Sequence, residues 1–366
     1  MAKEKLLIVG AFKPDLSKGI GGGVSASCLK LKDSHINDEF ELLLLDSTSK
    51  SNPPPPIFVR GFWAALRLYK FIKICYFERP EVVLLFASDG MSFLEKSLMG
   101  LLADYFGSRT FVFLRANRLV FQIKANRLFR MLVRSLNTER SSLLCQGSSI
   151  KDFGHHYLGY KEDNIFVVPN WTAGVGESFA VPEVNHDRPE VKFIYVGWMV
   201  REKGLFTLLD AFKKLHQAHS GAQLSMIGDG NDFEKLRSVV NDYELGSCVK
   251  FYGWLEGLEV KNLLLEHHIF VLPSLSEGMS NAVIEAMSVG LPVITTPVGV
   301  MPDFLIHDDS VIFVEPNNVE QLHAALLELY LDPEKRYKVA AAGKSLAIHQ
   351  FSPILAIDHL ISILKK

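Results

Sequence analysis

Cysteine is scarce in this sequence, and long uncharged apolar runs are absent. The four cysteines, Cys28, Cys75, Cys145 and Cys248, are scattered over 366 residues with no C-x-x-C pair and no histidine set at zinc spacing. This excludes a disulfide-stapled scaffold and a small zinc module, and we expect reduced, buried thiols in a cytoplasmic protein. No stretch of about 18–20 apolar residues runs without a charge, and the start MAKEKLLIVGAF has only about seven apolar residues after its charges. We therefore expect neither a membrane span nor a signal peptide.

Charge of either sign is moderate in total but unevenly distributed. The formal net charge is -2, from 39 Lys+Arg and 41 Asp+Glu. Residues 1–180 hold 23 of the basic and 17 of the acidic residues, whereas residues 181–366 hold 16 and 24. The first half is therefore the better candidate for contact with an anionic surface. With 48% hydrophobic residues, a chain of this length can bury the cores of two ordinary domains.

Short apolar runs alternate with longer segments of helical character along the chain, which is typical of β-α-β units and a parallel sheet. The first series of predicted strands is 6–10, 40–45, 82–86, 110–114, 143–146 and 165–168, and the second is 191–196, 223–227, 249–252, 269–272, 292–295 and 312–314. Glycines and prolines in the stretch 170–190 predict a linker. We therefore predict an α/β protein with two Rossmann-like doubly wound domains, residues 1–175 and 190–350, followed by a C-terminal helix in residues 351–366.

The segment Phe270–Val298, FVLPSLSEGMSNAVIEAMSVGLPVITTPV, predicts a strand, a polar loop, a short helix and a second strand. Asn281 is the predicted cap of a helix from Ala282 to Val289, which a glycine ends. Unpaired N–H groups at such a helix start, together with the helix dipole, attract phosphate at the carboxyl edge of a parallel sheet. Glu277 would lie just outside this helix start, and Glu285 would lie inside the helix.

Two carboxylates beside a phosphate pocket favour a ligand that brings hydroxyl groups, such as a diphosphate with a sugar at each end. The alternative is that Glu277 is a solvated loop acid and Glu285 a surface residue in an i, i+4 pair. The 29-residue string resembles the E-x7-E region of family 4 glycosyltransferases, the glycosyltransferase group 1, because the loop, both acids, EAM, G-x-P-V and T-x-P-V-G occur in the same order. That resemblance implies the GT-B fold, in which two Rossmann-like domains face each other across a cleft and the C-terminal helix packs back on the first domain.

Further motifs in the second half are similar to the same family. In FIYVGWMVREKGLFTLLDAF, a strand and a glycine lead to Lys203, which would neutralise the diphosphate as a point charge. Trp198 stands where the family usually has arginine, and Arg201 is the candidate second cation. A G-D-G turn and an F-x-G string follow later strands and lie near the nucleotide base in the family, although G-D-G alone is only a turn. The donor-binding residues implied in this half are Gly197, Gly228, Gly253, Gly278, Met279, Ser280, Asn281, Ala282 and Glu285.

A glycine run precedes a predicted helix, Ser25–Lys32, in the first half of the chain. Its spacing does not fit a dinucleotide-binding G-x-G-x-x-G, and about eight residues separate it from the first strand. The resemblance implies a glycine loop in which the N–H groups of Gly22 and Gly23 face the donor phosphate and the transferred sugar. A plain flexible connection is the alternative.

No acidic residue occurs between Asp104 and Glu139, where seven basic residues are interleaved with apolar ones. A basic amphipathic segment of this kind can lie on anionic lipid or bind the phosphates of a lipid-linked acceptor. The residues expected to do so are Arg115, Arg118, Lys124 and Arg127, and the segment Phe58–Arg79 has a similar character. Core helices with solvated basic faces are the alternative. Together the two segments favour peripheral contact with an anionic membrane at the inner face of the cell membrane, and no recognised module favours nucleic acid.

The resemblance implies transfer of a sugar, with retention of anomeric configuration, from a nucleoside-diphosphate sugar to an acceptor hydroxyl. UDP is the implied nucleotide, and a lipid-linked or other cell-surface glycan precursor is the implied acceptor. Glu277, Lys203 and Arg201 are the implied catalytic residues, and Glu285 would bind the ribose. Arg115 stands in for a first-domain histidine that the family often uses. No D-x-D motif accompanies the strand ends, so we expect neither a metal nor a cofactor.

Other protein classes are compatible with the same motifs. A nucleotide-sugar epimerase of the same fold would act on the donor without an acceptor. A non-catalytic nucleotide-binding relative is suggested by Trp198 and by Val300, which replaces a glycine that is usual in the family. The chain is too short to resemble the pyridoxal-dependent phosphorylases.

Overall fold

The computed structural model describes residues 3–15, 22–51, 55–88, 90–115, 118–171 and 190–366. The chain forms two compact units. Unit 1 comprises Met1–Ala173 together with Pro353–Lys366, and unit 2 comprises Gly174–Ser352. Most of the predicted linker falls on residues 172–189, which lie outside the described part.

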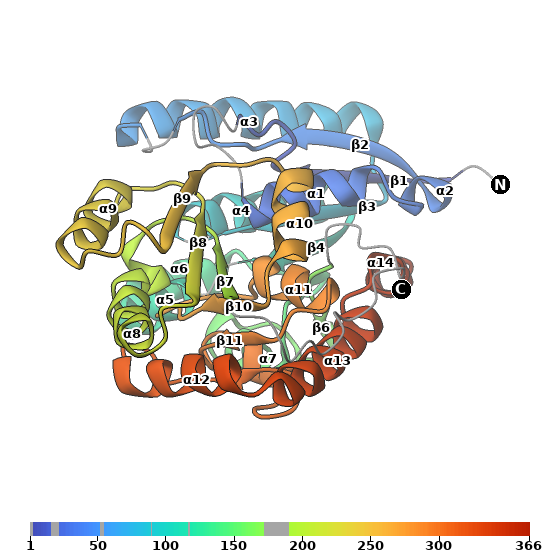
Figure 1. Cartoon of the computed structure of the whole chain (residues 1–366). Helices are drawn as coiled ribbons and strands as arrows, with labels where there is room; N and C mark the ends of the chain where they lie inside the picture. Colours follow the sequence, from blue (N-terminus) through green and yellow to red (C-terminus); the bar gives the residue numbers. More distant parts are fainter. Residues whose placement is uncertain (1–2, 16–21, 52–54, 89, 116–117, 172–189) are drawn as a thin grey trace. The chain divides into compact units, whose positions relative to one another are not determined.

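Unit 1 is built on a six-stranded parallel sheet with the order β2-β1-β3-β4-β5-β6 (Figure 1). Its strands are β1 Glu4–Gly10, β2 Phe40–Asp46, β3 Val82–Ala87, β4 Arg109–Leu114, β5 Ser141–Cys145 and β6 Ile165–Val167. All six were predicted from their apolar runs. β3 is buried over its whole length, as expected for a central strand whose sheet is covered by helices on both faces.

Alternate side chains of the unit 1 strands enter two cores. Leu6 and Ile8 of β1 face one core, and Leu7 and Val9 face the other. The first core is covered by α1 Gly23–Lys32, α2 Ile36–Glu39 and α14 Pro353–Leu364. The second is covered by α3 Ile57–Glu78, α4 Met91–Tyr105, α5 Arg118–Ala125, α6 Arg127–Ser135 and α7 Lys151–Phe153. Short 3-10 or π turns at Ser148–Ile150, Gly154–Leu158 and Glu162–Asn164 complete the unit.

Unit 2 contains a second six-stranded parallel sheet, with the order β12-β11-β10-β7-β8-β9. Its strands are β7 Val191–Val196, β8 Ala222–Ile227, β9 Val249–Gly253, β10 Ile269–Leu272, β11 Val293–Thr295 and β12 Ile312–Phe313. The chain moves outward from β7 through β8 to β9, then returns to place β10 on the other side of β7. The strand order therefore reverses between β7 and β10, and in sheets of this kind ligands bind outside the carboxyl ends at such a point.

Four helices of unit 2 lie between its strands in sequence, as expected for β-α-β units: α8 Leu205–Ala218, α9 Phe233–Asp242, α10 Gly257–Glu266 and α11 Asn281–Ser288. The helices α12 Val319–Leu331 and α13 Pro333–Gln350 follow the last strand, and 3-10 turns lie at Arg201–Lys203 and Met301–Asp303. α12 packs against α8, and α13 packs against α11. These two parallel sheets with their helices confirm the predicted α/β fold class.

The acid-free segment between Asp104 and Glu139 is divided among three elements. The predicted strand, β4, lies near its start and is mostly buried, and α5 and α6 follow. Asn126 separates these helices, because its side chain caps α6 by accepting a hydrogen bond of 2.9 Å from the Phe129 N–H. Arg109 is engaged inside unit 1, where it donates to the Leu364 carbonyl at 2.9 Å and pairs with Glu4.

One described stretch, Pro333–Leu364, passes a test of length and hydropathy for a membrane-crossing helix. It consists of two helices, α13 and α14, separated at Phe351 and Ser352. Leu360, Ile363 and other apolar residues of α14 are buried in the core of unit 1, while α13 packs in unit 2. Burial of this kind is typical of helices in protein cores, which pass the same test.

Candidate functional site

Two side chains predicted to act together, Lys203 and Glu277, come from the two strands at which the unit 2 sheet reverses. Lys203 follows β7 at the end of a 3-10 turn, and Glu277 lies in the loop after β10. Their Nζ and Oε1 atoms lie 2.5 Å apart, and the side chains are only 19% and 12% exposed. The fold thus joins residues 74 positions apart in the sequence into a largely buried ion pair at the carboxyl edge.

The polar environment of Glu277 fixes its carboxylate. Ser274 Oγ donates to the same Oε1 at 2.7 Å. The loop itself is tied to the β7 loop by a 2.7 Å hydrogen bond from the Leu275 N–H to the Glu202 carbonyl. Burial, with the Glu277 charge nearby, raises the pKa of the Tyr195 hydroxyl well above its usual range. Tyr195 stays a neutral donor and bonds the Trp198 carbonyl at 2.8 Å.

Two glycines allow these loops to approach one another. Gly204, directly after Lys203, has φ +68°, and a Cβ there would lie 2.1 Å from the Pro273 carbonyl oxygen. Gly299 has φ +67°, and a Cβ there would lie 2.4 Å from the Glu277 carbonyl oxygen. Both the left-handed conformation and the contact require glycine. Neither glycine was predicted as a site residue, although each lies within a motif on which the resemblance rests.

The two glycines expected near the nucleotide base, Gly228 and Gly253, lie at the ends of the adjacent strands β8 and β9, and Gly197 lies at the end of β7, next to β8. The Gly228 N–H donates to the Gly253 carbonyl at 2.8 Å, and the Gly197 N–H donates to the Ile227 carbonyl at 3.0 Å. Gly228 is buried and the other two glycines are half-buried. This part of the edge therefore has no side chains of its own to obstruct the close approach of a ligand.

The start of α11 lies one residue earlier than predicted. Ser280, not Asn281, is the N-cap: it has an extended conformation, and its side chain accepts from the Val283 N–H. Asn281 is the first helical residue. The error arose because serine and asparagine cap equally well, so adjacent candidates cannot be ranked from sequence. As expected, Gly278 and Met279 lie in the loop before α11, and Ala282 lies in the first turn of this helix. Glu285 lies about one turn further along α11 and is half-buried.

The tryptophan that replaces the family's arginine is part of an aromatic pair. The rings of Trp198 and Trp254 are 4.8 Å apart, and both side chains are half-buried. Among the residues that the structure describes, Trp254 Nε1 is buried and has no hydrogen-bond partner. Arg201 is exposed on the turn before Lys203. The sequence analysis did not identify Trp254, which directly follows the quoted F-x-G string.

The first-unit candidates divide into one buried and several exposed residues. Gly22 caps α1, and Gly23 is its first residue. The Arg115 guanidinium is 8% exposed, donates to Ser27 Oγ of α1 at 2.5 Å and lies over the rings of Phe113 and Trp171. Burial lowers its pKa to about 10. Arg115 therefore cannot belong to an exposed basic surface.

The other basic candidates belong to the helices after β4. Lys124 and Arg127 are exposed, beside exposed Leu128 and Met131 of α6. The side chain of Arg118, like residues 16–21 of the glycine run, lies outside the described part of the chain. The structure thus leaves a smaller basic surface than the sequence suggested.

No group of three or more His, Cys, Asp or Glu side chains in the described ranges is arranged to hold a metal ion. The four cysteines are all buried, as predicted, and none of them is joined to another in a disulfide. The polar groups assembled at the carboxyl edge of unit 2 are instead one cation, one carboxylate, a helix start and glycine backbone, a set suited to an anionic, hydroxyl-bearing ligand.

Two parallel α/β units, one of which carries this edge, define the GT-B class of proteins. Residues 177–346 match the sequence model of the family described as glycosyl transferases group 1. This segment is similar to that family, and the recognised resemblance is confirmed for it.

Known relatives and solved structures agree with this assignment. The amylovoran biosynthesis glycosyltransferase AmsK of Erwinia amylovora is 29% identical over 48% of this chain and 45% of its own length. The lipopolysaccharide core biosynthesis glycosyltransferase LpsE of Rhizobium meliloti is 27% identical over 57% of this chain and 59% of its own. The matches thus span about half the length of these relatives. The structure of Anabaena HepE in complex with UDP-glucose superposes with a TM-score of 0.74, at 14% identity, over 99% of both chains, which shows the shared fold.

Proposed function

We propose that this protein is a retaining glycosyltransferase that moves a sugar from a nucleoside-diphosphate sugar, a UDP-sugar by preference, to an acceptor hydroxyl. The observation that carries the proposal is the buried Lys203–Glu277 pair at the strand reversal of unit 2, within the segment that matches the family. Two further findings support it: relatives are named as glycosyltransferases of polysaccharide and lipopolysaccharide biosynthesis, and a protein of the same fold was solved with UDP-glucose.

In this reaction the bond between the anomeric carbon and the diphosphate breaks, and a bond from that carbon to the acceptor oxygen forms on the same face. Lys203 and the start of α11 stabilise the negative charge that grows on the departing diphosphate, and Arg201 is the second candidate cation. Glu277 orients the transferred sugar, and Glu285 binds the ribose hydroxyls. The cation role is filled by side chains, so the reaction is proposed to need no metal.

The acceptor is proposed to be lipid-linked, and the protein to contact an anionic membrane from the cytoplasmic side. Support comes from α3, whose exposed residues include Phe58, Phe62, Tyr69 and Tyr76 at helical spacing. The same helix carries Arg60, Arg67, Lys70 and Lys73 against a single acid, Glu78. An exposed aromatic face flanked by cations fits the interface of an anionic bilayer.

The donor half of the proposal is tested by thermal unfolding of the full chain with a panel of nucleoside diphosphates and their sugars. A ligand that binds only the folded protein raises the Tm. We expect UDP to raise it and one UDP-sugar to raise it further. The absence of any nucleotide effect would overturn the proposal. Conversion of the donor in the absence of an acceptor would favour the epimerase, and binding without turnover would favour a non-catalytic relative.

A further inference from the structure

Unit 1 contains a cavity of about 620 Å³ at the carboxyl edge of its own sheet. It is bounded by residues that directly follow β1, β2 and β3, and by α3 and α4. The strand order reverses here, because β1 pairs with β2 on one side and with β3 on the other. All residues that line the cavity belong to unit 1, and its size is that of a small-molecule site.

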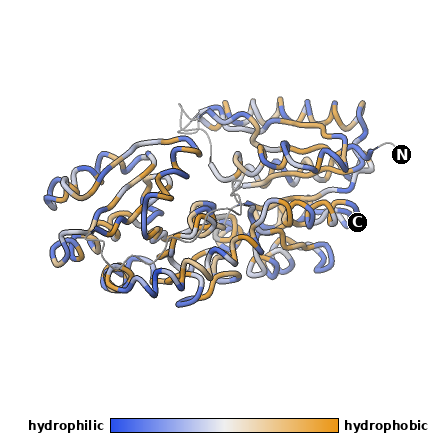
Figure 2. Tube along the Cα trace, turned by 45° about the vertical axis from the view of Figure 1, so that its right-hand side comes forward, coloured by the Kyte–Doolittle hydropathy of each residue, from blue (hydrophilic) through white to orange (hydrophobic). Residues whose placement is uncertain are grey.

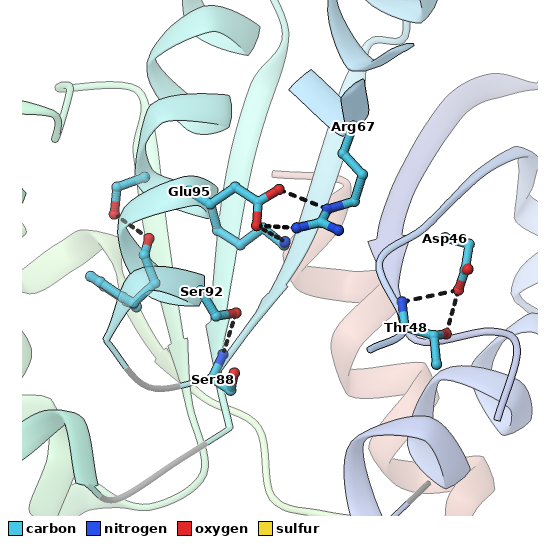
Figure 3. A network of polar contacts seen from close by, with 9 residues as sticks. Asp46, Thr48, Arg67, Ser88, Ser92 and Glu95 are labelled. Carbon is cyan, nitrogen blue, oxygen red and sulfur yellow. Dashed lines mark hydrogen bonds and ion pairs between the residues drawn. The ribbon is translucent and has the colours of Figure 1, made fainter. Parts of the chain in front are cut away.

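A charged triad lies in the wall of this cavity. Arg67 of α3 makes a bidentate ion pair with Glu95 of α4, in which Nε and Nη2 donate to the two carboxylate oxygens at 2.8 Å and 2.9 Å (Figure 3). Lys96, only 2% exposed, has its Nζ 3.4 Å from the same Glu95 carboxylate. The Arg67 guanidinium therefore makes the two short hydrogen bonds to the Glu95 carboxylate, and Lys96 makes one longer contact with it.

The cavity wall has more positive than negative charge. Of the described residues that line it, Glu95 is the only acid, whereas Arg60, Arg67 and Lys96 are cations. Burial lowers the pKa of Lys96, although the Glu95 charge opposes this shift. A buried cation without full compensation is unfavourable, and an anion entering the cavity would relieve that cost.

The remaining walls combine hydroxyl groups with apolar surface. Ser47, Ser49 and Ser88 lie on the strand-end side, Ser92 lies on α4, and Ile57, Ala64, Leu68, Leu94 and Leu98 line the helix side. The rim is held by Asp46, which accepts hydrogen bonds from the Thr48 hydroxyl and the Thr48 N–H (Figure 3). It also accepts one from the Phe12 N–H. A ligand that satisfies both sides has an anionic head and an apolar chain.

We propose that this cavity binds a phosphate ester on an apolar chain, as the anionic part of the acceptor. The inference rests on the proposed transferase function and gives its acceptor a definite class. Lys96 and Arg67 meet the phosphate, and the apolar chain leaves along α3. Figure 2 shows apolar positions recurring along that helix, whose opposite flank carries the exposed aromatic residues. The helix that lines the cavity is therefore also the one suited to the membrane that holds such a lipid.

The test is calorimetric titration of the full chain, without donor, using dodecyl phosphate below its micellar concentration. We expect saturable binding that Lys96→Met weakens by about tenfold or more, because a charge-assisted contact is lost. The matched control is Lys161→Met, which removes the same charge from an exposed position of unit 1 outside the cavity lining and should change affinity less than about twofold. Ala64→Phe, which fills the cavity without changing charge, should abolish binding.

Other probes separate the possible outcomes. Inorganic phosphate should bind at least about tenfold more weakly than dodecyl phosphate, since it gains nothing from the apolar walls. Equal affinities of the Lys96 and Lys161 variants, or equal affinities of the two phosphates, would overturn the inference. UDP binding is measured in parallel on the same samples. If the protein binds UDP but not dodecyl phosphate, the cavity proposal is refuted and the proposed transferase function stands. If it binds dodecyl phosphate but not UDP, the proposed transferase function is refuted.

Discussion

At the scale of single residues, the unit 2 site depends on placing a cation and a carboxylate in contact where solvent is largely excluded. Lys203 and Glu277 neutralise each other, and Glu277 also accepts a hydrogen bond from Ser274. These contacts hold both side chains in a fixed orientation, which is the preorganisation that electrostatic catalysis requires.

Removal of either member should be more damaging to turnover than to folding. We expect Glu277→Gln and Lys203→Met each to lower kcat on the order of 100-fold or more, because a preorganised charge at the reacting centre is lost. The double variant should be little worse than either single variant, since the two residues act as a unit. Steady-state transfer rates measure this effect, with Lys214→Met, in the exposed pair with Glu320, as the control. Rates near wild type in both single variants would refute the assigned roles.

Replacing Trp198 by the arginine that is usual in the family should lower the stability of the protein and raise its affinity for UDP. Trp198→Arg breaks the pairing with Trp254, so the free energy of unfolding should fall by about 1 kcal/mol. The new guanidinium should at the same time tighten UDP binding, because it places a second cation beside the diphosphate. Denaturant unfolding and nucleotide titration measure the two effects. Weaker UDP binding in this variant would show that the tryptophan itself contacts the nucleotide.

At the scale of elements, α3 has two distinct flanks. One lines the cavity through Ala64 and Leu68, and the other exposes a row of aromatic residues. A soluble helix normally places its apolar stripe in the core, yet only Phe71 and Cys75 of α3 are fully buried. The exposed row is consistent with an additional contact surface, and the cations that border it favour an anionic one.

Membrane contact through α3 can be tested with one charge on its exposed face. Phe58, which is 86% exposed, should tolerate Phe58→Asp without loss of folding. Sedimentation with anionic vesicles should then fall by about tenfold or more, because apolar contact is lost and a repelling charge is gained. Leu258→Asp on α10 is the control, since Leu258 is 72% exposed in unit 2. Equal vesicle binding by wild type and Phe58→Asp would exclude α3 as the contact.

At the scale of the whole molecule, two carboxylates of unit 1 predict its response to acid. Although burial opposes the shift, the Arg67 hydrogen bonds hold the pKa of Glu95 below its ordinary 4.5. The hydrogen bonds from Thr48 and Phe12 likewise outweigh burial and hold the pKa of Asp46 below 3.8. A depressed folded-state pKa stabilises the protein above the unfolded-state value, and this contribution is lost as pH falls through the folded-state value.

We therefore expect the free energy of unfolding of unit 1 to fall as pH drops below about 4.5. Glu95→Gln should be less stable than wild type at neutral pH by about 3 kcal/mol, since two cations lose their shared acid, and should depend less steeply on pH in this range. Chemical unfolding at a series of pH values measures both quantities. A variant with the same acid dependence as wild type would show that Glu95 does not control it.

The strands of both units were predictable, whereas the cavity was not. Runs such as 82–86 and 269–272 are apolar without interruption, and only burial on both sides of a parallel sheet favours that pattern. Lys203 and Glu277 were found through motif order, but their direct contact depends on strand adjacency. The cavity was missed because Arg67 and Lys96 lie in different helices, and each alone reads as part of a solvated basic face. Trp254 was missed because its partner, Trp198, lies on a strand end two strands away.

The return of α14 to unit 1 affects how the protein is made. Residues 353–366 supply Ile357, Leu360 and Leu364 to the core on one face of the unit 1 sheet, yet they follow all of unit 2 in the chain. During synthesis on the ribosome, unit 2 can complete its core while that face of the earlier unit still exposes apolar side chains. The nascent first unit is therefore incomplete through most of translation and becomes a finished fold only after the chain beyond residue 352 has emerged.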